Sequence, residues 1–184
     1  MKTNLLFICL LFSLSSLGQT TSLSTDLDED GQKDKVVLKT EGDFGYKIVY
    51  SLSSQKGKSY ESQVVTLGGQ TNELSLKNKV VILTSTYMRG VNTFKFRYDK
   101  ALKQLKVIGY DNEQFGNAVN DGSGTGSYNL STGTVEATWN SYNEKKQTLI
   151  TLPTIRKKLP VRNYTVSDFS DKLIEKLDAA VTNN

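Results

Sequence analysis

The 184-residue sequence contains no histidine and only one cysteine, Cys9. The absence of histidine excludes catalytic triads with a histidine base, histidine-ligated zinc and histidine general acids. Cys9 lies inside an apolar run near the start of the chain, not at the end of that run, where lipidation would follow cleavage. Because no other cysteine follows, the domain must be stabilised by its core, by a metal, or by both.

Long basic blocks and long apolar runs are missing as well. The net charge is only +4, and no extended lysine and arginine block suits nucleic acid. The apolar run Leu5–Phe12 is shorter than the roughly 20 residues that a membrane-spanning helix needs. We therefore expect a chain that neither binds nucleic acid nor spans a membrane.

The first residues have the three parts of a secretory signal peptide. A positively charged head precedes the run Leu5–Phe12, and small residues then lead to a cut ahead of Gln19. The alternative, a buried N-terminal helix, would be apolar on every face. We predict that residues 1–18 are a signal peptide and that the protein is periplasmic or secreted. Residues 19–184 then have the length of one domain.

Alternation of apolar and polar residues dominates the middle of the chain and predicts many short strands. The residues that share a face in these strands are Tyr46, Ile48, Tyr50 and Leu52; Phe94, Phe96 and Tyr98; and Val135, Ala137 and Trp139. The continuous run Val80–Leu83 predicts a strand buried on both faces. Strands at this spacing are typical of a β-sandwich or a partly open barrel. We predict an all-β sandwich.

The end of the chain predicts one helix, over residues 166–181. Its apolar residues recur at steps of three and four: Val166, Phe169, Leu173, Leu177 and Ala180. Thr165 and Asp168 form a capping-box variant at its start. We expect this stripe to pack against an open edge or face of the β structure.

The acidic segment 26–34 has the spacing of a calcium-binding loop. Aspartates occupy positions 1, 3, 5 and 9 and a glycine occupies position 6: Asp26, Asp28, Asp30, Asp34 and Gly31. The backbone carbonyl of Gln32 would supply position 7. These acids repel one another unless a cation lies among them, and calcium prefers hard oxygen ligands. The segment therefore predicts calcium as a cofactor.

The segment differs from an EF-hand at two points. Position 12, a bidentate glutamate in EF-hands, is Val37, and the loop leads into a predicted strand instead of a helix. A further ligand would come from elsewhere, and Asp111, Glu113 and Asp121 are the candidates. The alternative interpretation is a solvated acidic turn.

The glycine-rich segment 120–129 has no Gly-Lys-Ser/Thr sequence and is not a phosphate loop. It is either a flexible connection between strands or a protruding loop that presents Ser123 and Tyr128 to the cleft of a partner.

Trp139 and Tyr142 suggest a second kind of binding surface, a platform on which a sugar ring stacks. Trp139 also suits the core, because it shares a face with Val135 and Ala137. The carboxylates are scattered and no motif requires an enzyme, so we predict a non-enzymatic protein.

Several segments together resemble a known group of proteins. They are the calcium loop with the strand that follows it, 28–38, and the segments 96–99, 105–111 and 127–133. Their order is similar to that in exported bacterial proteins with a C2-like β-sandwich and a calcium loop. This group includes periplasmic inhibitors of invertebrate-type lysozyme and immunity proteins against peptidoglycan-cutting effectors.

The resemblance covers roughly residues 26–152, as the predicted strands delimit it. It implies a C2-like sandwich and a peptidoglycan-cleaving enzyme as the partner. In such inhibitors a Ser-Gly-x-Tyr type loop enters the muramidase cleft; Ser123-Gly124 matches the start of that pattern, and Tyr128 follows later. A carbohydrate-binding or adhesion module remains the alternative function.

Overall fold

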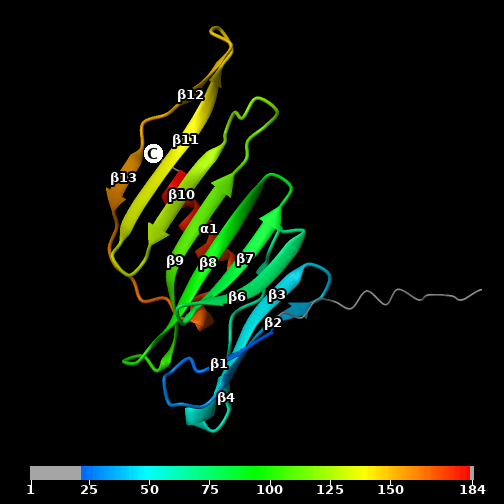
Figure 1. Cartoon of the computed structure of the whole chain (residues 1–184), viewed down its shortest axis with the longest axis vertical. Coiled ribbons are helices and arrows are strands. Elements are labelled where there is room, and N and C mark those ends of the chain that lie inside the picture. The colour runs from blue at the N-terminus through cyan, green and yellow to red at the C-terminus, as the bar shows by residue number, and fades with distance from the viewer. Residues whose placement is uncertain (1–21, 183–184) are drawn as a thin grey trace, which may run out of the picture.

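The computed structural model describes residues 22–182, so the predicted signal peptide lies outside the described residues. Within them the chain forms two antiparallel sheets and one α-helix near its C-terminal end (Figure 1). The prediction of an all-β sandwich with one C-terminal helix is confirmed.

The smaller sheet is built from the N-terminal third of the chain. Its strand order is β1-β2-β3-β4, with β5 also paired to β3. The bounds are β1 (Ser22–Thr25), β2 (Asp34–Glu41), β3 (Gly45–Leu52), β4 (Lys58–Glu61) and β5 (Val65–Thr66), and a 3-10 turn, η1 (Ser53–Gln55), follows β3. The alternation predicted for β3 is present, because Ile48, Tyr50 and Leu52 are buried while the residues between them are only half-buried.

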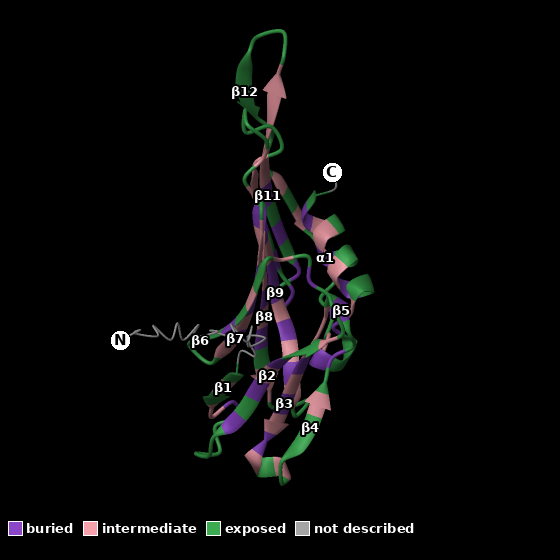
Figure 2. Ribbon diagram, turned by 90° about the vertical axis from the view of Figure 1, so that its right-hand side faces the viewer, coloured by how far each residue is buried: buried purple, intermediate pink, exposed green. Residues whose placement is uncertain are grey.

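The larger sheet has eight strands in the order β12-β11-β10-β9-β8-β7-β6, with β13 paired to β11. The bounds are β6 (Thr71–Lys77), β7 (Val80–Tyr87), β8 (Gly90–Asp99), β9 (Gln104–Gln114), β10 (Gly124–Asn129), β11 (Thr134–Asn143), β12 (Thr148–Thr151) and β13 (Ile155–Lys158). The hairpin of β11 and β12 projects beyond the rest of the sheet as an arm (Figures 1 and 2).

Strand β7 is buried on one face only, which corrects the prediction for the run Val80–Leu83. Val81 and Leu83 are buried, whereas Val80 and Ile82 are half-buried. Figure 2 shows the reason: the helix α1 (Asp171–Thr182) and strands β3 and β4 lie on the same side of the larger sheet. Its other face is open to solvent over β7.

The predicted helix over 166–181 is divided into two pieces. A 3-10 turn, η2 (Val166–Asp168), carries the capping box of Thr165 and Asp168, and α1 begins only at Asp171. Phe169, between them, has extended backbone angles, and its ring meets Phe94 and Phe96 edge-on at centroid distances of 5.1 and 5.3 Å. The insertion of this ring into the core interrupts the helix.

Helix α1 packs across β9, β10 and β11, as its apolar stripe predicts. Polar bonds position it: the indole Nε1 of Trp139 donates to the carbonyl of Val181 at 3.1 Å, and the Tyr110 hydroxyl donates to Asp178 at 2.9 Å. A Cβ at Gly126 would lie 2.6 Å from the Cβ of Val181, so this glycine permits the close approach of the helix. In the described part of the chain, no helix has the length and apolar character needed to cross a membrane.

Candidate metal centre

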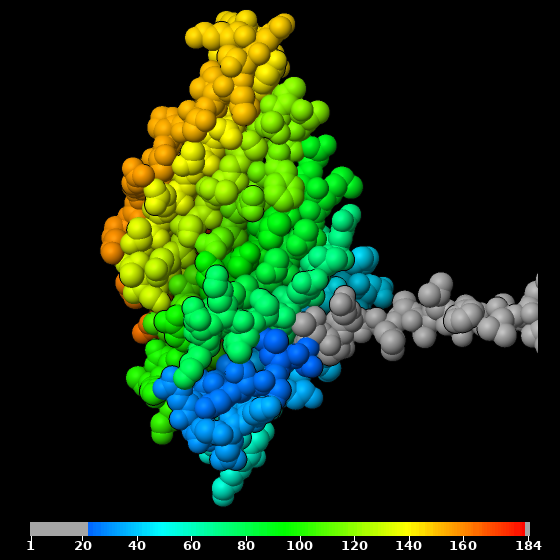
Figure 3. Space-filling model, in the orientation of Figure 1, coloured from blue at the N-terminus to red at the C-terminus, as the bar shows by residue number. Residues whose placement is uncertain are grey.

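The acidic segment forms the loop between β1 and β2, in the blue region at the lower end of the molecule (Figure 3). The carboxylate of Asp26 accepts hydrogen bonds from three successive backbone amides, those of Glu29 at 2.8 Å, Asp30 at 3.1 Å and Gly31 at 3.1 Å. Glu29 and Gly31 have positive φ values of 68° and 86°. The loop therefore winds around Asp26, and Gly31, at position 6 of the calcium-loop pattern, has the left-handed conformation that favours glycine.

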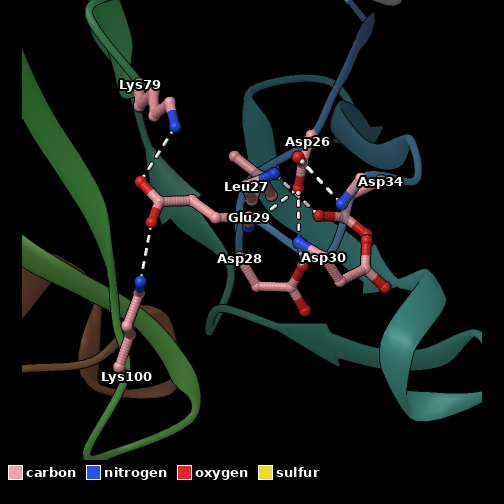
Figure 4. A network of polar contacts seen from close by, with 9 residues as sticks. Asp26, Leu27, Asp28, Glu29, Asp30, Asp34, Lys79 and Lys100 are labelled. Carbon is pink, nitrogen blue, oxygen red and sulfur yellow. Dashed lines mark hydrogen bonds and ion pairs between the residues drawn. The ribbon is translucent and has the colours of Figure 1, made fainter.

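Three of the predicted ligands converge. One carboxylate oxygen each from Asp26, Asp28 and Asp34 lies within 4.8 Å of the other two (Figure 4). Asp34, at the start of β2, is only 2% exposed. It accepts hydrogen bonds from the amide of Leu27 at 2.8 Å and from the amide and hydroxyl of Ser53 at 2.8 and 2.9 Å. Asp34 thus joins the loop to η1.

Asp30 has a different arrangement from the one predicted, whereas the role of the Gln32 carbonyl as a ligand stays a prediction. The carboxylate of Asp30 is outside the group of three and accepts hydrogen bonds from the Gln32 amide at 2.7 Å and the Ser53 hydroxyl at 3.3 Å. The bond that an aspartate accepts from the backbone amide two residues further on forms an Asx-turn, which shapes the loop.

The three candidates for a further ligand lie elsewhere: Asp111 and Glu113 in β9, and Asp121 in the turn between β9 and β10. Asp111 is paired with Lys95, Glu113 lies opposite Thr125 of β10, and Asp121 accepts a bond from the Tyr142 amide. The group that does lie beside the loop is the hydroxyl of Ser54 in η1, which donates to Asp28. Serine hydroxyls from η1 therefore complete the oxygen-rich surroundings of the cluster.

Glu29 points away from the three aspartates (Figure 4). Its carboxylate bonds to the ammonium groups of Lys79, at 2.8 Å, and Lys100, at 2.6 Å. These lysines lie in the turns after β6 and β8, so Glu29 connects the acidic loop 26–34 to the larger sheet. Hydrogen bonds to Lys100 and Lys79, and then their charges, lower the pKa of Glu29 from 4.5 to about 2.

The Glu29 contacts predict a pH-dependent contribution to stability. Because the pKa of Glu29 is lower in the folded state, its contribution is complete above about pH 4.5 and is lost as the pH falls to about 2. At low salt and pH 6, Glu29→Gln should lower the free energy of unfolding, and this difference from wild type should close by about pH 2. Urea unfolding of both proteins at the two pH values measures it. An equal difference at both would contradict the ion-pair assignment.

The arrangement of the cluster suits a hard cation. Asp26, Asp28 and Asp34 present carboxylate oxygens to one another at short range, while the neighbouring Lys79 and Lys100 bind Glu29. Repulsion among carboxylates at this distance is relieved when a cation lies between them. Oxygen ligands are those that calcium prefers.

The predicted partner-binding residues are not neighbours on one loop. Residues 120–123 form a turn, but β10 begins at Gly124, so the second half of the glycine-rich segment is strand. Tyr128 lies in that strand, is 7% exposed and belongs to the core. This burial is incompatible with Tyr128 as the anchor that enters a partner's cleft. Ser123 donates to the carbonyl of Asn120 at 2.6 Å and remains in the turn.

Three exposed apolar residues on the two turns near Ser123 were not predicted from the sequence. The amide of Phe115 donates to the carbonyl of Arg89 at 2.8 Å, which holds the turn after β7 beside the loop 115–123. Met88 and Phe115 are 78% and 48% exposed, and Val119 is also exposed. Because these residues come from two separate turns and follow no periodic pattern, only their position in the structure reveals this group.

Trp139 and Tyr142 do not form a single platform. Residues three apart in a strand point to opposite faces, and Trp139 faces α1, where its indole bonds to Val181. Tyr142 lies opposite Leu149 in the projecting arm. The sugar-stacking prediction is therefore reduced to Trp139 alone.

In comparisons with known proteins, no family model, no curated protein and no solved structure matches the chain.

Proposed function

We propose that the chain is an exported, calcium-stabilised binding protein without enzymatic activity, which acts in the periplasm or outside the cell. The observation that supports this proposal is the convergence of Asp26, Asp28 and Asp34 within 4.8 Å in a loop that winds around Asp26. With Val37 in place of the position-12 glutamate, the dissociation constant should be that of extracellular modules, roughly 10⁻⁴–10⁻³ M.

The proposed partner is a peptidoglycan-cleaving enzyme, as the resemblance implies. The exposed group of Met88, Phe115 and Val119 supports this choice, because apolar side chains on adjacent loops can fill a cleft. Phe115 takes the role that was predicted for Tyr128, since an aromatic ring buries a large area at little cost in side-chain entropy. Ser123 lies at the end of the same loop.

A glycan-binding module is the second candidate, and one cavity supports it. Trp139, Leu152 and Pro153 line a cleft of about 330 Å³, together with Asp121. Its lining combines the indole and apolar side chains with the polar residues Asp121, Asn140, Ser141 and Thr182. A concave site with apolar walls and converging polar groups is typical of small-molecule binding. Stacking on the indole and hydrogen bonds to Asp121 would hold a sugar ring there.

Inhibition assays with calcium present separate the two candidates. Muramidases and lytic transglycosylases are assayed with the wild type, with Phe115→Ser and with Phe44→Ser, whose ring is 77% exposed in the β2–β3 turn. Loss of a central aromatic anchor costs ~2 kcal/mol or more, so Phe115→Ser should weaken inhibition by about 30-fold. Phe44→Ser should inhibit like the wild type, and neither change should lower the melting temperature appreciably.

Two results would contradict the inhibitor proposal. One is an absence of inhibition by the wild type across the panel. The other is equal inhibition by Phe115→Ser and wild type, which would show that this loop is not the contact surface. Binding to a glycan array that is lost in Trp139→Ala would support the second candidate.

A further inference from the structure

A cavity of about 210 Å³ lies between α1, β10 and the segment that follows β13. Its lining includes two tyrosines, Tyr128 and Tyr164, and two cations, Arg162 and Lys176. Apolar side chains from the linker and from the helix form the rest, Leu159 and Leu177 among them. The calcium loop, the loop 115–123 and the Trp139 cleft contribute no residue to this lining.

The hydroxyl of Tyr128 has no hydrogen-bond partner among residues 22–182. Only 7% of Tyr128 is exposed, but its hydroxyl is not among the buried polar atoms of the described residues that lack a partner, so the oxygen lies at the accessible wall of the cavity. By contrast, the two most buried tyrosines, Tyr50 and Tyr110, form hydrogen bonds through theirs. The hydroxyl of Tyr128 is therefore a donor that solvent reaches through the cavity, and it is available to a bound molecule.

The surroundings of this hydroxyl select an anionic group. Burial raises the pKa of Tyr128, the adjacent Tyr164 phenol acts in the same direction, and the Arg162 guanidinium opposes both. Tyr128 is thus a neutral donor at pH 7. Arg162 and Lys176 add positive charge, and no carboxylate is part of the lining. Cations and phenolic donors without an acidic side chain bind carboxylate or phosphate oxygens.

We propose that this cavity binds a small molecule that carries a carboxylate or phosphate on a compact apolar group. The guanidinium of Arg162 is suited to two parallel bonds to such an anion, and Lys176 adds a second charge. Leu159 and Leu177 contact the apolar group. A volume of about 210 Å³ equals that of roughly seven liquid waters, which suits one small ring with its substituent. This site is independent of the calcium loop and of the hydrolase partner.

The proposal is tested by titrating the full protein with benzoate and phenyl phosphate, followed by amide chemical shifts. Both anions should bind saturably and shift the amides of β10 and α1. Benzyl alcohol, which lacks the charge, and inorganic phosphate, which lacks the ring, should each bind at least about 10-fold more weakly. A preference between the two anions would show whether carboxylate or phosphate is the natural head group.

Three substitutions assign the contacts. Arg162→Gln should weaken the binding of the anions about 10-fold or more, and Tyr128→Phe, which removes only the hydroxyl, should weaken it about 5-fold. Lys172→Gln removes a charge from the same helix one turn outside the lining and should leave the affinity unchanged. Melting temperatures near that of the wild type show that each variant is folded.

Three outcomes would overturn the proposal. They are no saturable binding of either anion, binding of benzyl alcohol as tight as that of benzoate, and unchanged affinity in Arg162→Gln combined with Lys176→Gln. The second would leave an apolar cavity without selection for charge, and the third would place the anions at another site.

Discussion

Addition of about 10 mM calcium is expected to raise the free energy of unfolding by about 1.4–2.7 kcal/mol. This range follows from an ion bound only by the folded state with a dissociation constant of roughly 10⁻⁴–10⁻³ M. For a domain of this size it corresponds to an increase of roughly 3–10 °C in melting temperature. The physical cause is the mutual repulsion of Asp26, Asp28 and Asp34, which the ion removes.

Variants of the loop distinguish a metal effect from a general salt effect. Asp26→Ala combined with Asp28→Ala should abolish the calcium-dependent shift. Glu29→Gln removes one negative charge from the same loop but leaves the three aspartates in place, so its shift should equal that of wild type. Magnesium at the same concentration should have a smaller effect, because it requires near-octahedral geometry. An unchanged melting curve in the presence of a chelator would identify the loop as an acidic turn only.

Phe169→Ala is expected to lower the free energy of unfolding by about 3–5 kcal/mol, the usual cost of removing a fully buried phenylalanine ring. Phe169 is completely buried, contacts the rings of Phe94 and Phe96, and accepts a bond from the Gln63 amide at 3.1 Å through its carbonyl. Its loss would leave a cavity where η2, β8 and the smaller sheet meet.

Urea unfolding of Phe169→Ala and of Phe44→Ala measures this effect. Phe44 is 77% exposed, and substitutions at such surface positions usually change stability by less than about 0.5 kcal/mol. If Phe169→Ala is too unstable to purify, Phe169→Leu should fold with a smaller loss, because it retains much of the buried volume. Similar stabilities for the alanine variants at 169 and 44 would contradict the packing described for Phe169.

Much of the fold was predictable because the relevant pattern is local. The alternation of Ile48, Tyr50 and Leu52 indicates which face of β3 is buried. This pattern can be recognised without knowing where β3 lies in the fold. The interruption of the C-terminal helix at Phe169 was not predictable in the same way. The spacing of Val166, Phe169 and Leu173 fits an unbroken helix, and the interruption comes from contacts with rings that lie about 75 residues earlier in the chain.

The same distinction between local patterns and distant contacts applies to the candidate metal site. The spacing of Asp26, Asp28 and Asp34 matches a calcium-loop pattern, and the glycine at position 6, Gly31, predicts the sharp turn that brings these aspartates together. The hydroxyls of Ser53 and Ser54 and the lysines that bind Glu29 come from other elements, and no periodicity in the sequence connects them to the loop.

The glycine-rich segment was misread for a specific physical reason. Glycines there predict a flexible loop, but Gly124 and Gly126 lie in β10 and leave room for the ring of Trp139 and for Val181 of α1. Glycine in a strand can mark the close approach of another group as well as a turn. Tyr128, two residues further on, is therefore a core residue with its hydroxyl at a cavity, not the tip of a loop.

The contacts of the acidic loop 26–34 also have a consequence for the order of folding. The bonds that wind the loop around Asp26 join residues three to five positions apart, whereas Glu29 binds lysines that are 50 and 71 positions away. Closing a short segment costs little chain entropy, and contacts between distant residues form late. The loop can therefore close soon after residues 26–34 have left the ribosome, and its connection to the larger sheet must wait until β6 to β9 have assembled.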